Sequence, residues 1–274
     1  MNKRRTLWIY LLLNSAVVII FSLLFYAKPA LSQTTMGWQQ LPALLARIKA
    51  PTFPNRDFKI TDFGALGDGK TDNTEAIRKA VDAANKAKGG RVVVPAGVWL
   101  TGAIHLKSNV NLHVSEGATL KFIPDPAKYL PLVFTRWEGV ELMNYSPLIY
   151  AFEQENLAIT GKGTLDGSAS YENWWGWNKK MPGQPTKQVP ARNLLIEQGD
   201  KGVPVAERKH GEGSFLRPNF IQPYRSRNIL IEGVTILNSP MWEINPVLCT
   251  NVTVRGVTVN SHGPNNDGCD PESC

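Results

Sequence analysis

The sequence predicts an all-β fold: a parallel β-solenoid with one helix at its N-terminal end. The first observation is a repeat, because NILIEGVTILNS from Asn228 and NVTVRGVTVNSH from Asn251 share an Asn, alternating aliphatics and Gly-Val-Thr at an offset of 23 residues. The second is the alternation of apolar and other residues, which buries one face of each strand. The third is the short length of the unit, which cannot close a core by itself and must stack on its neighbours.

Two earlier stretches continue the repeat in weaker form. NVNLHVSEGATL begins at Asn109 and NLAITGKGTLDG at Asn156, 47 residues later, and a further 72 residues lead to Asn228. We interpret these intervals as about two and about three units, the longer one including a polar insertion. Asn suits a turn, where it hydrogen-bonds the backbone or adopts the left-handed region, so all four asparagines are expected to be structural.

An amphipathic helix is expected before the repeats, in DNTEAIRKAVDAANKAKGG. Thr71 or Asp72 would cap its start, and Gly89-Gly90 would end it. Such a helix would cover the first coil of the solenoid and hide a sheet edge that invites aggregation. The residues on its apolar face are Ile77, Ala80, Val81 and Ala84.

Residues 1–32 have the pattern of an export signal, since MNKRR precedes an apolar run at residues 7–27. Small residues at Ala30 and Ser32 place cleavage after Ser32. The run of about 20 residues could also span a bilayer, so a retained membrane anchor is the alternative. We therefore expect a periplasmic or secreted protein, with residues 33–56 as a lead-in and residues 57–274 as the solenoid.

The net charge gives little sign of a nucleic-acid partner. The chain carries +7, and the leader contributes four of these charges, from Lys3, Arg4, Arg5 and Lys28, so that +3 remains. Nucleic-acid binding usually calls for a clustered basic face, whereas a charge of +3 is compatible with an anionic polymer. We expect no nucleic-acid partner.

The cysteines and histidines do not indicate a metal site. Three cysteines, Cys249, Cys269 and Cys274, are an odd number, so one disulfide or three free thiols both remain open. The four histidines show no metal-ligand spacing, and we expect no cofactor.

A phosphate-loop pattern occurs in GALGDGKT, from Gly64 to Thr71. The preceding KITDF alternates instead of forming a buried strand, and Asp68 and Asp72 would place negative charge beside phosphates. We interpret the stretch as a Gly-rich turn that leads to the helix, and expect no nucleotide partner.

Several stretches together resemble glycoside hydrolase family 28, the polygalacturonases and their relatives. They are ITDFGALGDGKTDNTEAI, RWEGVELMNYSPLIYA, ITGKGTLDG, RPNFIQ, NSPMWEINPV and SHGPNNDGCDPES, and they extend over nearly all of residues 57–274. The resemblance implies a right-handed, single-stranded parallel β-helix of the pectin lyase-like type. It also implies hydrolysis of α-1,4-galacturonosidic bonds in pectin, with inversion, on a galacturonan substrate.

The family's Asn-x-Asp-Gly motif reads Asn265-Asn266-Asp267-Gly268 in this chain. The resemblance implies that Asp267 activates water, with a partner on the following coil; a turn-capping aspartate is the structural alternative. The family's later Asp-Asp, Gly-His-Gly and Arg-x-Lys motifs do not occur after it. We therefore expect a C-terminally truncated member without its general acid, itself inactive, binding pectin weakly at most and poorly soluble.

Other residues are candidates for substrate binding. Asn265, Arg136 and His262 belong to family-like stretches, and Trp175 lies in SYENWWGWNKK, whose aromatics and lysines could face a sugar or pack on the solenoid wall. Trp242 is expected to pack against the core. Calcium-dependent β-elimination by a pectate lyase and non-catalytic pectin binding are the alternative functions; endo or exo action stays open.

Overall fold

The computed structural model describes residues 37–178 and 186–274, and the chain divides into two compact units, Met1–Arg47 and Ile48–Cys274. The predicted signal or anchor in residues 1–32 and the lysines at 179 and 180 lie outside the described residues. In the first unit, the described part is the short helix η1 (Gly37–Gln40) followed by α2 (Leu41–Arg47). No helix among the described residues is long and apolar enough to cross a membrane.

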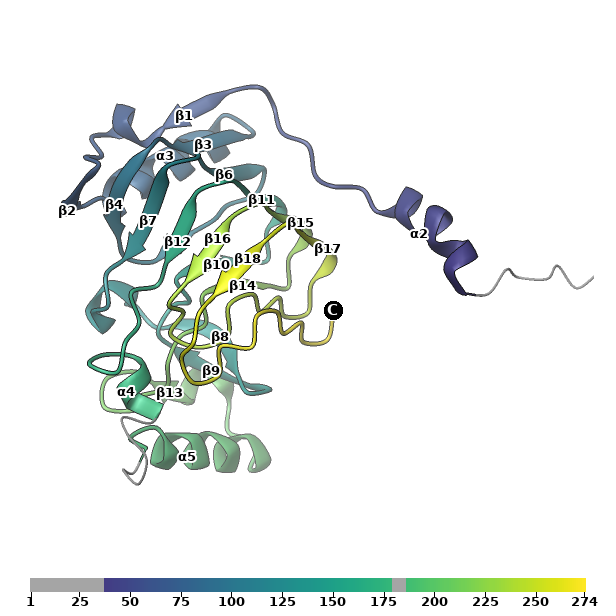
Figure 1. Cartoon of the computed structure of the whole chain (residues 1–274). Helices are drawn as coiled ribbons and strands as arrows, with labels where there is room; N and C mark the ends of the chain where they lie inside the picture. Colours follow the sequence, from purple (N-terminus) through teal and green to yellow (C-terminus); the bar gives the residue numbers. More distant parts are fainter. Residues whose placement is uncertain (1–36, 179–185) are drawn as a thin grey trace, which may run out of the picture. The chain divides into compact units, whose positions relative to one another are not determined.

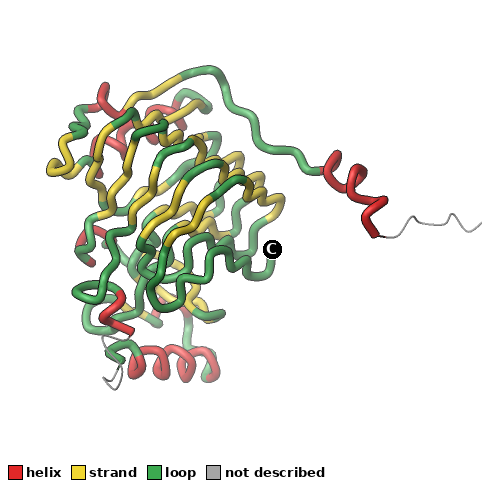
Figure 2. The backbone as a smooth tube through the Cα atoms, in the orientation of Figure 1, coloured by secondary structure: helices red, strands yellow, loops and turns green. Residues whose placement is uncertain are grey.

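The second unit is a parallel β-helix built from three sheets that run along its length (Figures 1 and 2). The first sheet has the order β1 (Asp57–Lys59), β3 (Gly90–Val94), β6 (Val110–Val114), β11 (Glu155–Gly161), β15 (Arg227–Glu232) and β17 (Thr250–Arg255). The second contains β2 (Asp68–Asp72), β4 (Gly97–Thr101), β7 (Ala118–Phe122), β12 (Thr164–Asp166), β16 (Thr235–Leu237) and β18 (Thr258–Asn260). The third contains β5 (Ile104–His105), β10 (Ile149–Phe152) and β14 (Ile221–Tyr224).

The spacing of the repeats differs from the sequence expectation at two of three intervals. The 23-residue offset is confirmed as one rung, because β15 pairs directly with β17. The intervals of 47 and 72 residues are also one rung each, since β11 pairs with β6 on one side and with β15 on the other. The interpretation as two and three units was wrong, because pairing between rungs does not depend on how many residues loop out between sheets.

Those extra residues form two insertions. The first contains η3 (Pro126–Tyr129) and the hairpin of β8 (Val133–Trp137) and β9 (Val140–Asn144), which pair antiparallel. Its turn is Glu138-Gly139, both with positive φ. The second contains α4 (Trp175–Asn178), α5 (Val189–Asp200), η4 (Val205–Glu207) and β13 (Lys209–His210), which pairs with β9.

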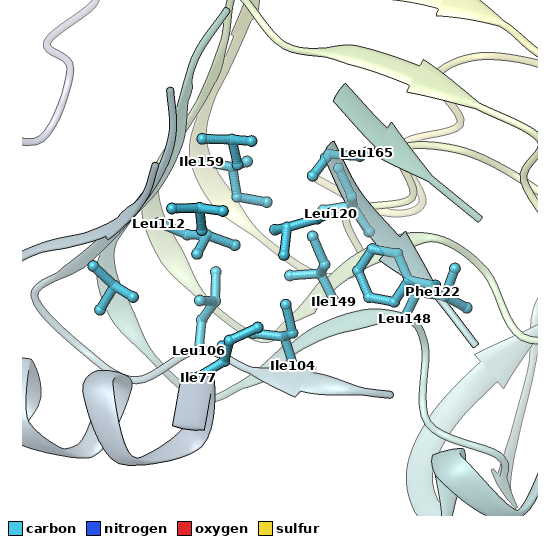
Figure 3. Close-up of a cluster of buried hydrophobic side chains, with 14 of the residues drawn as sticks. Ile77, Ile104, Leu106, Leu112, Leu120, Phe122, Leu148, Ile149, Ile159 and Leu165 are labelled. Atoms are coloured by element: carbon cyan, nitrogen blue, oxygen red, sulfur yellow. The ribbon is translucent and has the colours of Figure 1, made fainter. Parts of the chain in front are cut away.

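The interior of the β-helix is filled mainly by aliphatic side chains from its three sheets. Figure 3 shows a group of labelled Ile and Leu residues together with Phe122. The inward positions expected from the repeat are confirmed: Ile229, Ile231, Val234 and Ile236 are at most 3% exposed. Rungs approach closely at Gly161, where φ is 116° and a Cβ would lie 2.0 Å from the Val114 carbonyl oxygen. Glycine is therefore required at that position.

The four asparagines form a ladder along one corner of the helix. Each has a φ between 54° and 66°, so the left-handed turn is confirmed. Their side chains bond to one another: Asn156 donates to Asn109 at 2.9 Å, Asn228 to Asn156 at 3.1 Å and Asn251 to Asn228 at 3.0 Å. The asparagines therefore satisfy their own polar groups from rung to rung.

The expected helix is α3 (Thr74–Lys86), which packs on the first coil after η2 (Ile60–Phe63) and β2. Its predicted apolar face is buried, together with Ala76. The cap position is Asn73, so the expectation of Thr71 or Asp72 there was wrong; the Asp72 carboxylate does accept the Thr74 N–H at 3.0 Å. In the Gly-rich stretch, the Asp68 carboxylate accepts the N–H groups of Lys70 and Thr71, at 2.9 and 2.8 Å.

Candidate active site

The Asn-x-Asp-Gly motif lies on the rung directly beyond residues 242–247. Isolated parallel bridges join Ile244 to Cys269 and Val247 to Glu272, so residues 267–272 run alongside that segment. Asp267 is exposed, and its Oδ2 accepts a hydrogen bond of 2.9 Å from the Trp242 indole N–H. The next residue, Gly268, donates its N–H to Glu243 Oε2 at 2.8 Å. The preceding rung thus positions Asp267 through one hydrogen bond at its carboxylate and one at the next residue.

Asn266 anchors the turn that leads to Asp267. Its amide nitrogen donates to the carbonyls of Ser239 and Met241, at 3.1 and 2.9 Å. Its amide oxygen accepts from the Ser261 hydroxyl and the Gly263 N–H, both at 2.7 Å. The Asn266 amide therefore links two parts of the turn and joins the turn to the preceding rung.

Arg217 supports the same turn from a wholly buried position. Its guanidinium donates to the carbonyls of Pro240 and Pro264, at 2.8 and 2.7 Å, and to Asn265 Oδ1 at 2.6 Å. Burial lowers the pKa of this guanidinium to about 10, against the favourable charges of Glu138 and Asp267. Arg217 is therefore a charged group at neutral pH, and it connects two consecutive rungs.

Asn265 and Trp175 meet at this turn. Asn265 has a φ of 60°, and its Oδ1 also accepts from Asn178 Nδ2 at 2.9 Å. Trp175 donates its indole N–H to the Ser239 carbonyl at 2.8 Å. Its ring lies so close to Gly263 that a Cβ there would be 2.2 Å from Nε1, so the turn needs glycine. Helix α4 thus contacts Gly263 through its first residue, Trp175, and Asn265 of the motif through its last residue, Asn178.

The other tryptophans of the insertion pack on the wall of the β-helix. Trp174 is 1% exposed, and its ring centroid lies 5.6 Å from that of Tyr129 and 4.6 Å from that of Trp177. Trp174 and Trp177 therefore pack on the wall of the β-helix. Trp175 packs against the same core, and its ring also lies against Gly263 in the turn that precedes the motif. Among the sequence candidates, the structure brings Asp267, Asn265 and Trp175 together.

Arg136 and His262 occupy different surroundings. The Arg136 side chain is 14% exposed, with Glu141 at 3.7 Å and Glu272 at 4.0 Å. Its guanidinium therefore faces two carboxylates of the chain itself. His262 is exposed, and its Nε2 lies 2.8 Å from Asn260 Oδ1. Substrate contacts by these two residues stay predictions.

Three carboxyl groups near the motif have raised pKa values. Burial raises the pKa of Glu243, which is 0% exposed, to about 7. Burial also raises the pKa of Asp270, with the Asp267 charge adding to the effect, and it raises the pKa of Glu272 against the opposing charge of Arg136. The exposed carboxylate of Asp267 thus stands beside three carboxyl groups whose pKa values lie above their ordinary values.

Comparison with known proteins shows which family the chain belongs to. Residues 58–118 match the family model described as rhamnogalacturonase A/epimerase, pectate lyase-like. A Vitis vinifera protein named "Probable polygalacturonase" is 31% identical over 227 residues, 78% of this chain and 39% of that protein. A Thermotoga maritima structure titled as a hyperthermoactive exopolygalacturonase has 52% identity and a TM-score of 0.81, covering 86% of this chain and 54% of that one. The chain belongs to the polygalacturonase-like family, glycoside hydrolase family 28.

The fold of this polygalacturonase-like chain is accordingly the right-handed parallel β-helix that its sequence predicted. The Yersinia enterocolitica family 28 exopolygalacturonase shares that fold at 24% identity and a TM-score of 0.57, over 78% of this chain and 40% of that one. The chain spans about half or less of the length of these relatives.

Sequence reasoning did not foresee the contacts that three residues make at the candidate site. Trp242 was expected to pack, and it does lie against a buried cluster with Trp137, but it also bonds Asp267. Arg217 and Glu243 were not singled out. The available signal was a charged residue inside an otherwise apolar stretch, FLRPNF and MWEINPV, each of which predicts a buried charge with a specific role. Within residues 37–178 and 186–274, no group of three or more His, Cys, Asp or Glu side chains is arranged to hold a metal ion.

Proposed function

We propose that the protein containing these residues hydrolyses α-1,4-galacturonosidic bonds of pectin galacturonan, with inversion, and that Asp267 is the carboxylate that activates water. One observation supports this role above all. Asp267 is exposed at its rung while Trp242 fixes its carboxylate, and Asn266 and Arg217 fix the turn that carries it. Such preorganisation is typical of a group that must meet a reacting water in one orientation.

Inverting hydrolysis needs a second carboxyl group about 6.5–9.5 Å from the first, to protonate the leaving oxygen. Adjacent rungs lie about 4.8 Å apart, so an acid on a neighbouring rung with a sideways offset meets this requirement. On the rung of Asp267 and the rung before it, Glu243 is fully buried, Asp270 and Glu272 are partly buried, and Glu232 is in an ion pair with Arg255. We therefore propose that the acid lies on another rung of the complete protein, and that these 274 residues alone show almost no turnover.

We further propose exo action, which releases galacturonate from a chain end. The support is the 52% identity to a chain whose title names it an exopolygalacturonase. Export is proposed with it, since galacturonan is an extracellular polymer and residues 1–32 carry the export pattern.

The test is product analysis on polygalacturonate with the complete protein encoded by the gene that contains these residues. We expect a reducing monosaccharide from the first time points, and proton NMR is expected to show the β-anomer forming before mutarotation. A mixture of oligomers at early times would overturn exo action alone. Unsaturated products, which absorb in the ultraviolet, would overturn hydrolysis in favour of β-elimination. The same assay on the 274-residue chain tests the placement of the acid: rapid turnover that Asp270→Asn abolishes would assign that role to Asp270.

A further inference from the structure

Three thiols line one hollow at the last rungs of the β-helix, where the chain ends beside β17 (Figure 1). Cys249 is buried, whereas Cys269 and Cys274 are exposed. The Cys249 backbone N–H donates to Cys274 Sγ at 3.3 Å. Cys274 Sγ therefore lies against the Cys249 backbone on the neighbouring rung, and Cys269 lies on the same rung as Cys274.

The register of the rungs pairs Cys249 with Cys274. Val247 bridges to Glu272, 25 residues later, and Leu248 donates its N–H to the Glu272 carbonyl at 2.9 Å. The next residues, Leu248 and Ser273, are again 25 apart and both left-handed, with φ of 51° and 55°. The two rungs therefore turn at the same place, and Cys274 follows that turn directly above Cys249.

Cys269 has a different neighbour. It bridges to Ile244, which in turn bridges to Ile221, so the residue beneath Cys269 is aliphatic. Residues in register on adjacent parallel strands have Cα atoms about 4.8 Å apart, inside the range of about 4.4–6.8 Å that disulfides require. Of the three possible cysteine pairs, the register therefore favours Cys249 with Cys274.

We propose that Cys249 and Cys274 are a disulfide-forming pair that links the rung bearing the Asn-x-Asp-Gly motif to the rung below, with Cys269 left as a free thiol. The chemistry is thiol–disulfide exchange with a small-molecule or protein disulfide as the oxidant. The thiolate of exposed Cys274 attacks one sulfur of the oxidant and releases its other half as a thiol. The Cys249 thiolate then attacks Cys274 Sγ and releases the second thiol.

Atoms and electrons balance in this exchange. The chain loses two protons and two electrons, and the oxidant's disulfide becomes two thiols. Burial raises the pKa of the Cys249 thiol to about 11, which is why the exposed thiol is the first to react.

The crosslink would act on the site through its supporting rung. Asn266 already ties the start of this segment to residues 239 and 241, and the disulfide would tie its end to residue 249. A rung fastened at both ends has fewer ways to open, so the crosslink would stabilise the segment on which Asp267 lies. This inference does not depend on the proposed hydrolysis.

The experiment oxidises the purified full chain with glutathione disulfide, blocks the remaining thiols and digests it with trypsin. Cys249 lies in peptide 228–255, and Cys269 and Cys274 lie in peptide 256–274. We expect one blocked thiol in place of three and a disulfide joining the two peptides. The crosslink should persist in Cys269→Ser, disappear in Cys274→Ser, and raise Tm by roughly 5 to 10 °C relative to the reduced chain.

Three results would overturn the proposal: three blocked thiols after oxidation, a disulfide within peptide 256–274, or a link between the peptides that survives Cys274→Ser and is lost in Cys269→Ser. Circular dichroism of both variants controls for folding. Both serines replace exposed cysteines, so each variant is expected to retain the β-helix.

Discussion

The Arg217 guanidinium donates a hydrogen bond of 2.6 Å to Asn265 Oδ1 from a position where the arginine has no exposed surface. A buried cation is costly unless its donors are satisfied, and Arg217 satisfies them with oxygens of Gln188 and of two consecutive rungs. Those rungs are the ones that carry Trp242 and Asp267. The geometry of the candidate catalytic carboxylate therefore depends on an interaction inside the protein.

Replacing this arginine should destabilise the fold. Arg217→Met is expected to lower the free energy of unfolding by about 2–4 kcal/mol, because it leaves buried carbonyl oxygens without donors. Urea denaturation measures the change. The matched control is Arg227→Met, which removes an ion pair with Glu155 whose side chains are 67% and 42% exposed and should cost less than about 1 kcal/mol. Equal losses in the two variants would contradict a supporting role for Arg217.

Glu243 should make stability depend on pH. Its folded-state pKa of about 7 lies above the ordinary value of 4.5, so the native state binds the proton more tightly. The resulting penalty is absent below pH 4.5, grows as pH rises and is complete above pH 7. Glu243→Gln removes it and should be more stable than the parent by about 2–3 kcal/mol at pH 8, with no such gain at pH 4.

Urea denaturation at both pH values checks this expectation. Asp270 and Glu272, whose pKa values shift in the same direction, are present in both proteins and cancel in the difference. A gain that is the same at pH 4 and pH 8 would show that Glu243 titrates normally.

The asparagine ladder should stabilise the fold in two separable ways. Asn228→Gly keeps the left-handed backbone but loses the bonds to Asn156 and Asn251, at an expected cost of about 1–2 kcal/mol. Asn228→Ala loses the same bonds, and holding alanine in the left-handed backbone conformation costs about 1–2 kcal/mol more. Thermal unfolding should therefore rank the parent first, glycine second and alanine last. Equal melting temperatures of Asn228→Ala and Asn228→Gly would mean that the backbone conformation at Asn228 carries no strain.

Trp242 should act on catalysis through Asp267. Trp242→Phe keeps an aromatic ring in the buried cluster but removes the N–H that bonds Asp267 Oδ2. Loss of one such bond, about 1.4 kcal/mol, should reduce kcat roughly tenfold in the complete protein with little change in KM. Trp38→Phe, at a residue 87% exposed in the other unit, is the control. A rise in KM at constant kcat would instead indicate that the indole binds substrate.

The sequence predicted the rungs well because alternation and turn residues act locally. Ile229 and Ile231 point inward, and Asn228 turns the chain, for reasons contained within a dozen residues. It did not predict that β6, β11 and β15 are immediate neighbours, because rung pairing is a long-range contact that tolerates loops of any length. For the site, the Asn-x-Asp-Gly pattern located Asp267, but the supports of that residue come from distant segments. Arg217 and Trp242 act through contacts that only the stacked rungs create.

Asp267 is proposed above as the water-activating carboxylate of a galacturonan hydrolase. The most direct measurement is reducing-sugar release from polygalacturonate by the complete protein and its Asp267→Asn variant, with Asp82→Asn on helix α3 as the matched control. We expect Asp267→Asn to lower kcat by roughly 10²–10⁴-fold at unchanged stability, since a general base contributes about that much, and Asp82→Asn to have the parent's rate. Turnover by Asp267→Asn close to that of the parent would contradict that role.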